Sequence, residues 1–229
     1  MGGVESSARN HEMISCNLNR LKRVLCVGAH SDDIEIGCGG TVLQMVEQSK
    51  NIEFYWLVLC SNPTRAEEAK RSANVFLSGV RNKTVVVKSF QDGFLPYLGP
   101  PVKECFEELK KDFTPDVILT HCRHDLHQDH RLVCELTWNT FRNHFILEYE
   151  IPKYDADLRS PNFFVPLSES HAHKKVKRLM RCFTTQQNKQ WFSEELFYGL
   201  MRLRATEAAS PTRYAEAFCC RKMLLGTTN

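Results

Sequence analysis

The sequence lacks the features that mark several large classes of protein. None of its apolar runs approaches the roughly 18 residues that a membrane-spanning helix requires, and its first residues lack the apolar core of a secretory signal. The net charge is only +3, whereas nucleic-acid-binding domains usually have a stronger basic bias. We therefore expect a cytoplasmic protein with no stable membrane insertion and no nucleic-acid partner.

Disulfide cross-links are not expected either. The chain has 10 cysteines, but they form no Cys-x-x-Cys pair and no regular framework. Several lie within apolar runs such as VLCVGA and FYWLVLC, which is typical of reduced, buried thiols. A chain of 229 residues, of which 42% are apolar, is long enough to bury a core without cross-links.

From Leu21 onward, short apolar runs alternate with longer amphipathic stretches. This alternation predicts an α/β fold, a Rossmann-like and mostly parallel sheet flanked by helices in a single domain. We expect strands at residues 23–28, 53–59, 84–88 and 116–120. We expect helices at residues 40–49, 65–78, 102–113 and 129–143.

The chain divides into a leading segment and one folded domain. We expect residues 1–20 to be flexible and residues 21–229 to form the domain, with a Rossmann-like core over 21–145 and a different C-terminal part over 146–229. A stretch rich in Pro, Asp and Ser opens this second part and predicts a loop with one or two short strands. Helices near 171–184 and 188–204 and a short segment near 214–223 follow.

Two features of the second part have ordinary structural interpretations. The basic cluster at residues 171–181 has apolar residues at helical spacing, so it predicts the solvated face of a helix, with an anionic ligand as the alternative. Trp191, Phe192 and Phe197 also follow helical spacing and are predicted to lie in the core.

Histidines and aspartates concentrate in two loops that follow predicted strands. The first loop contains His30-Ser31-Asp32-Asp33, and the second contains His127-Gln128-Asp129-His130. Ligands of open α/β sheets bind beyond the carboxyl ends of the strands, so both loops are expected at one site.

Three of these side chains make a metal site. A catalytic zinc ion needs three protein ligands, usually imidazole or carboxylate, and one open position. His30 and Asp33 are able to bind one ion from a single loop, and His130 completes the set from the second loop. Such oxygen and nitrogen ligands also accommodate Fe²⁺ or Co²⁺.

The remaining polar residues of the loops suit acid–base chemistry. Asp32 is a spare carboxylate beside the metal and is expected to act as the general base. His127, one helical turn from His130, is placed to protonate a leaving amine or to stabilise an oxyanion, and Asp129 to orient and charge it. His121 and Asp125 are expected to form the wall or to hydrogen-bond the ligands, with helix capping as the alternative for Asp125.

The two motifs resemble those of the LmbE-like, PIG-L family of zinc-dependent deacetylases. That family has Ala-His-Pro-Asp-Asp with a following Gly-Gly-Thr, and later His-x-Asp-His. Here the motifs stand at Ala29 to Asp33, Gly39 to Thr41 and His127 to His130. Ser31 replaces the usual proline, which donates nothing to a metal or substrate, so the mechanism is expected to persist.

The resemblance implies a Rossmann-like fold and zinc-dependent hydrolysis of the N-acetyl group of a small molecule that contains N-acetylglucosamine. It makes His30, Asp33 and His130 the zinc ligands, Asp32 the general base, and His127 with Asp129 the acid and its partner. Residues 146–229 are expected to shape the substrate pocket. The resemblance also implies that Arg65 and Glu68 line that pocket. Asp92, after the third predicted strand, is a further candidate for binding a sugar hydroxyl, although an Asp-Gly turn explains it equally well.

Several alternatives remain at this stage. His30 alone is compatible with a structural histidine, and Asp32-Asp33 with a helix cap. The Gly-rich stretch lacks the Gly-x-Gly-x-x-Gly spacing of dinucleotide-binding sites. A zinc amidase that acts on a non-sugar amide or a longer acyl group, a non-catalytic family member that binds zinc or sugar, and a homo-oligomeric state all stay open.

Overall fold

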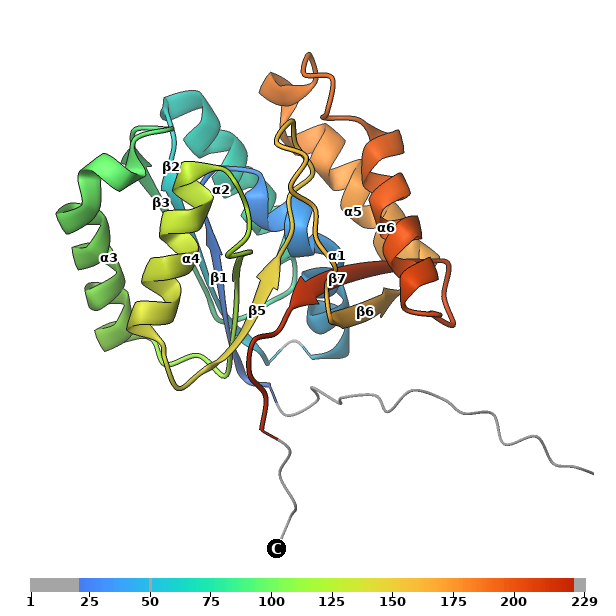
Figure 1. The fold of residues 1–229 in the computed structure, drawn as a ribbon, viewed down its shortest axis with the longest axis horizontal. Helices are drawn as coiled ribbons and strands as arrows, with labels where there is room; N and C mark the ends of the chain where they lie inside the picture. Colours follow the sequence, from blue (N-terminus) through green and yellow to red (C-terminus); the bar gives the residue numbers. More distant parts are fainter. Residues whose placement is uncertain (1–20, 50, 225–229) are drawn as a thin grey trace, which may run out of the picture.

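A computed structural model describes residues 21–49 and 51–224, and within them a seven-stranded sheet has the order β3-β2-β1-β4-β5-β7-β6 (Figure 1). The strands are β1 (Arg23–Gly28), β2 (Glu53–Cys60), β3 (Lys83–Phe90), β4 (Val117–His121), β5 (Phe145–Tyr149), β6 (Phe163–Leu167) and β7 (Tyr214–Cys219). Strands β1 to β5 pair in parallel, whereas β7 runs antiparallel to both β5 and β6.

Alternate side chains of the strands pack against two helical layers. Val24 and Cys26 belong to the apolar cluster on one face of the sheet, and Leu25 and Val27 to the cluster on the other, as the two-residue period of a strand requires. The first face carries α1 (Asp33–Gln48), α2 (Pro63–Phe76), α5 (Glu169–Cys182) and α6 (Glu194–Glu207). The second carries α3 (Gly99–Asp112) and α4 (Gln128–Thr140), which lie at the left of Figure 1. This confirms the predicted α/β fold.

The helix starts follow recognisable capping residues. Asn62, Ser168 and Ser193 each accept a hydrogen bond from the backbone N–H three residues ahead, which satisfies a donor that the helix itself leaves unpaired. The sequence-based prediction missed Ser193 and started the last helix at residue 188, six residues before α6 begins. It also missed β5, a strand of five residues at the break in the pattern.

The helix predicted at residues 40–49 begins earlier in the structure, so Gly37, Gly39 and Gly40 all lie inside α1. The helix begins at Asp33 and has a kink at Cys38, where φ is −143°. Gly37 is required there because a Cβ atom on it would lie 2.2 Å from the Tyr149 ring. Gly37 therefore allows α1 to pass very close to Tyr149 at the end of β5.

A buried ion pair replaces the helical hydrogen bond that the kink breaks. The Gly40 N–H donates to Glu216 Oε1 at 2.8 Å, and the Ile36 carbonyl accepts from Lys175 Nζ at 2.6 Å. Lys175 and Glu216 lie 2.6 Å apart and are 4% and 2% exposed. The basic segment is thus largely a solvated helix face, as predicted, but Lys175 has a structural role on its buried side.

Among residues 21–49 and 51–224, no helix is both long enough and apolar enough to cross a membrane. The flexible segment predicted for residues 1–20 lies outside the described part of the chain. The division at residue 145 stays a prediction; β6 and β7, from the second part, extend the same sheet as the first.

Candidate metal and acid–base site

The two predicted loops meet at the carboxyl ends of β1 and β4. These strands are neighbours in the middle of the sheet, where the strand order changes direction. Such a switch point separates the following loops and leaves a crevice between them. The loop after β1 leads into α1, and the loop after β4 leads into α4.

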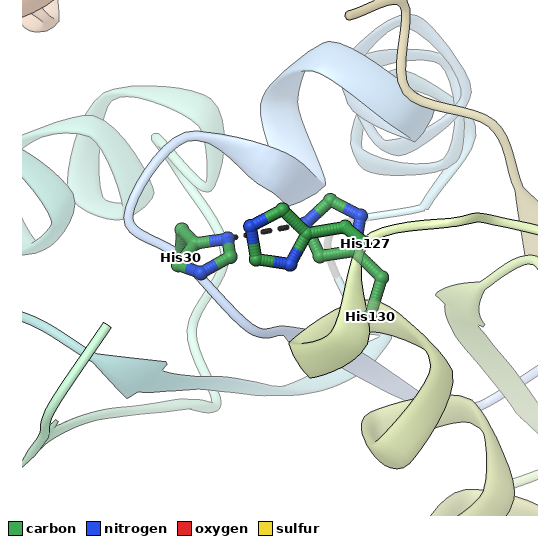
Figure 2. A group of neighbouring side chains, drawn as sticks. All are labelled: His30, His127 and His130. Atoms are coloured by element: carbon green, nitrogen blue, oxygen red, sulfur yellow. Dashed lines mark hydrogen bonds between the residues drawn. The ribbon is translucent and has the colours of Figure 1, made fainter. Parts of the chain in front are cut away.

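The three predicted metal ligands converge. His30 Nδ1 lies 3.1 Å from His130 Nε2 and 3.3 Å from Asp33 Oδ2, and His130 Nε2 lies 3.6 Å from Asp33 Oδ2. Ligand atoms of a tetrahedral zinc ion, each about 2.0–2.1 Å from the metal, lie about 3.3 Å apart. The triangle therefore fits one metal ion, and Figure 2 shows the imidazoles of His30, His127 and His130 gathered there.

The state of His130 also suits a metal ligand. Its side chain is 3% exposed, and burial together with the neighbouring His121 lowers the pKa of His130 to about 3. The ring is therefore neutral near pH 7, as ligation requires. Asp125 Oδ2 lies 2.8 Å from His130 Nδ1, on the outer side of the ring.

Three overlapping groups in the described residues are able to hold a metal ion. They are His30 with His127 and His130, His30 with Cys60 and Asp129, and Asp33 with His121 and His130. His121, predicted as a wall residue, is fully buried; its Nε2 lies 2.9 Å from the Ala29 N and 3.1 Å from Asp33 Oδ2. Every group includes His30 or His130, so the three groups are adjacent. Asp129 faces His30 Nε2, whereas His130 and Asp33 face His30 Nδ1.

Asp32 has one oxygen held and one oxygen without a partner. Arg65 Nη2 donates to Asp32 Oδ1 at 2.6 Å, while the buried Oδ2 has no hydrogen-bond partner within the described residues. Burial raises the pKa of the Asp32 carboxyl, and the Arg65 guanidinium offsets only part of this effect. A carboxylate with a raised pKa and an unoccupied oxygen is suited to accept a proton.

His127 and Asp129 contact each other through the Asp129 backbone N–H, whereas the prediction was that Asp129 orients and charges His127. His127 caps α4, with its Nδ1 accepting from the Asp129 N–H at 3.2 Å. The Asp129 carboxylate accepts from the N–H groups of Gly93 and Leu95 and lies 3.2 Å from His30 Nε2. Asp129 therefore contacts His30 through its carboxylate and His127 through its backbone.

Arg65 lines the cleft beside the site, whereas Glu68 faces away from it. Arg65 Nη1 donates to Glu68 Oε2 at 2.9 Å. Glu68 is 4% exposed and also accepts from Thr184 Oγ1 and from both the N–H and Oγ1 of Thr185. Glu68 thus anchors the short helix Thr184–Gln186 that follows α5.

Asp92 lies both in a turn and at the cleft. It precedes Gly93, whose φ is +81°, in a tight turn, and glycine adopts this conformation without steric cost. Its Oδ1 lies 3.0 Å from His30 Nε2, and its side chain is 76% exposed. It is therefore accessible from the cleft.

A cleft of about 1090 Å³ opens over the centre. The C-terminal part contributes to its wall Ile151, Lys153, Tyr154, Asp155, Thr185, Gln186, Lys189 and Trp191. Trp191 was predicted to be core, but it is only half-buried and lines the cleft. None of the eight follows a recognisable motif, so the sequence contained no signal for them.

Comparison with known proteins found a relative that matches part of the chain. A diacetylchitobiose deacetylase from Thermococcus kodakarensis is 31% identical over 129 residues, which cover 49% of this chain and only 46% of that protein. The chain thus matches about half the length of this relative.

Solved structures share the fold at lower identity. N,N'-diacetylchitobiose deacetylase from Pyrococcus horikoshii has a TM-score of 0.68 at 20% identity, over 88% of this chain and 84% of that one. GalB, the 4-carboxy-2-hydroxymuconate hydratase from Pseudomonas putida, has a TM-score of 0.72 at 17% identity, over 91% and 99%. The fold therefore accommodates more than one reaction. The family model described as PIG-L: GlcNAc-PI de-N-acetylase matches residues 25–141, just over half of the 229 residues, and the chain belongs to this family.

Proposed function

We propose that this protein is a metal-dependent deacetylase that removes the N-acetyl group from a small molecule containing N-acetylglucosamine. The observation that carries the proposal is the unpartnered Oδ2 of Asp32 next to the triangle of His30, Asp33 and His130. Membership of a de-N-acetylase family supports the same reaction.

In this proposal His30, Asp33 and His130 hold the metal, which we expect to be zinc. When bound, the ion supplies Lewis-acid chemistry, since it polarises a carbonyl group and acidifies water. The proposal keeps Fe²⁺ and Co²⁺ as alternatives, because a ligand set of two imidazoles and one carboxylate also accommodates them.

Asp32 accepts the proton of the attacking water through its Oδ2, while Arg65 holds Oδ1 and so sets the direction of the carboxylate. His127 lines the same cleft and donates to the oxyanion or to the leaving amine. Asp129 assists His127 through its negative charge, which opposes the lowering of the His127 pKa by burial and by His30.

The cleft supports a substrate larger than an acetyl group alone. Arg65 and Asp92 line it and are placed to bind sugar hydroxyls, whereas Glu68 would act by holding Arg65. The C-terminal wall residues then contact the remainder of the molecule. We place the protein in the cytoplasm, because buried cysteines such as Cys26, Cys38 and Cys134 are free thiols.

The test is acetate release from N-acetylglucosamine and a series of its glycosides by the purified protein. Chelated protein, and chelated protein reloaded with zinc, iron or cobalt, run alongside. We expect metal-dependent release that Asp32→Asn lowers by at least roughly 10²-fold, the usual contribution of a general base. Asp112→Asn is the control, since Asp112 is an exposed carboxylate at the end of α3 and does not line the cleft.

Other substrates separate the remaining hypotheses. Release of longer acyl groups or from non-sugar amides, with none from the sugars, identifies a different amidase. Bound metal without turnover of any amide identifies a binding protein. Equal activity of the Asp32→Asn and Asp112→Asn proteins contradicts the assigned mechanism.

A further inference from the structure

Lys153 stands at the centre of a buried charge cluster beside the metal triangle. It belongs to the segment between β5 and β6, its side chain is 10% exposed, and it lines the cleft. Its Nζ lies 2.9 Å from Asp125 Oδ1 and also donates to Asp157 Oδ2. Both carboxylates are only 3% exposed, so the single ammonium group compensates two buried negative charges.

Asp125 connects this cluster to the second motif. Its Oδ2 lies 2.8 Å from His130 Nδ1, and its Oδ1 accepts from the His127 N–H at 2.8 Å. The Asp125 carboxylate therefore links Lys153 to the outer nitrogen of His130.

We propose that Lys153 is a positioning residue that fixes the Asp125 carboxylate and, through it, the orientation of His130 toward the metal. This inference rests on the metal site of the proposed function. It connects the C-terminal part of the chain to the metal centre by charge, in addition to its role as a wall of the cleft.

The physical reason is the cost of leaving a buried charge without its partner. Without the ammonium, Asp125 and Asp157 are two buried carboxylates that have lost their shared counter-charge, and the Asp125 carboxylate rotates away from its present position. His130 then loses the carboxylate that orients it. Loss of such an outer partner typically weakens metal binding by 10–100-fold.

The experiment compares Lys153→Met with Lys153→Arg and the wild type. Metal-free proteins are reloaded with zinc in competition with a chelator to measure the dissociation constant, and with cobalt to record the visible absorption spectrum. Lys189→Met is the matched control, because Lys189 lines the same cleft but its cation lies over the Trp191 ring. Asp157→Asn tests the other branch of the cluster.

We expect Lys153→Met to bind zinc roughly 10–100-fold more weakly and to change the cobalt spectrum. The zinc dissociation constant should stay within a few-fold of the wild-type value in Lys153→Arg, Lys189→Met and Asp157→Asn, since each of these variants keeps a cation against Asp125. A folded Lys153→Met protein with wild-type zinc affinity overturns the proposal.

Two further outcomes keep the interpretation unambiguous. If Lys153→Met does not fold, Asp125→Asn takes its place, because this variant keeps Lys153 paired with Asp157. Asp125→Asn must then bind zinc more weakly by the same factor. Wild-type zinc affinity in Asp125→Asn overturns the proposal. If the wild type binds no metal, the proposed function itself fails. If the wild type binds zinc and Lys153→Met binds it with the same affinity, the role of Lys153 is refuted while the proposed function stands.

Discussion

The buried pair of Lys175 and Glu216 yields a stability prediction that is worked from its contacts. Lys175 Nζ donates to Glu216 Oε1 and to the Ile36 carbonyl, both at 2.6 Å. Glu216 additionally accepts from the N–H of Gly40 at 2.8 Å and from the N–H of Thr41 at 2.7 Å. Lys175→Met would leave a buried carboxylate without its counter-charge and a helical carbonyl without a donor.

Removing one partner of a buried ion pair costs roughly 3–5 kcal/mol. For a domain of this size, each kcal/mol lowers the melting temperature by about 2–4 °C, so the expected loss is roughly 6–20 °C. Glu216→Gln should cost a similar amount. The double variant should cost less than the sum by roughly 1–3 kcal/mol, because each single change already removes the shared contact.

Urea denaturation of the four proteins measures these free energies of unfolding. Lys177→Met is the control, since Lys177 is an exposed lysine on the same helix, and we expect it to remain within about 0.5 kcal/mol of the wild type. A loss below about 1 kcal/mol for Lys175→Met, or strict additivity of the two changes, would refute the role assigned to the pair.

Three other predictions concern single positions. Gly37→Ala should lower the free energy of unfolding by roughly 1–3 kcal/mol or more, because its Cβ would lie 2.2 Å from the Tyr149 ring. Gly99→Ala is the control and should cause no such loss, since nothing lies within 4 Å of its Cβ. Equal urea midpoints of the two variants would contradict this. Burial raises the pKa of Glu35 to about 8 from 4.5, so the native state binds more protons than the unfolded state between these values. The stability of the metal-free protein should therefore fall as pH rises through this range, by up to about 1.4 kcal/mol per unit, and Glu35→Gln should reduce that slope in denaturation measured from about pH 5 to 8. His127→Asn, which keeps the capping acceptor, should lower kcat roughly 10²–10⁴-fold with unchanged metal content by elemental analysis; loss of the metal would instead make His127 a ligand.

The central part of the fold was predictable because its signals are local. Strand β1 has the predicted bounds, and β2, β3 and β4 differ by one or two residues, since buried parallel strands are short apolar runs. Strand β5 and the start of α1 were not predicted. In α1, Gly37 is required for close packing against Tyr149, and such a contact between distant segments leaves no local pattern.

The sequence by itself predicted a metal site at His30, Asp33 and His130, because these residues stand in two recognisable motifs at strand ends. Only the tertiary structure decided what surrounds them. The partners of Asp129, the charge cluster of Lys153 and the place of Trp191 on the cleft wall all depend on loops from distant parts of the chain. Short-range patterns record the chemistry of a strand end, whereas the position of a long loop depends on the whole packed domain.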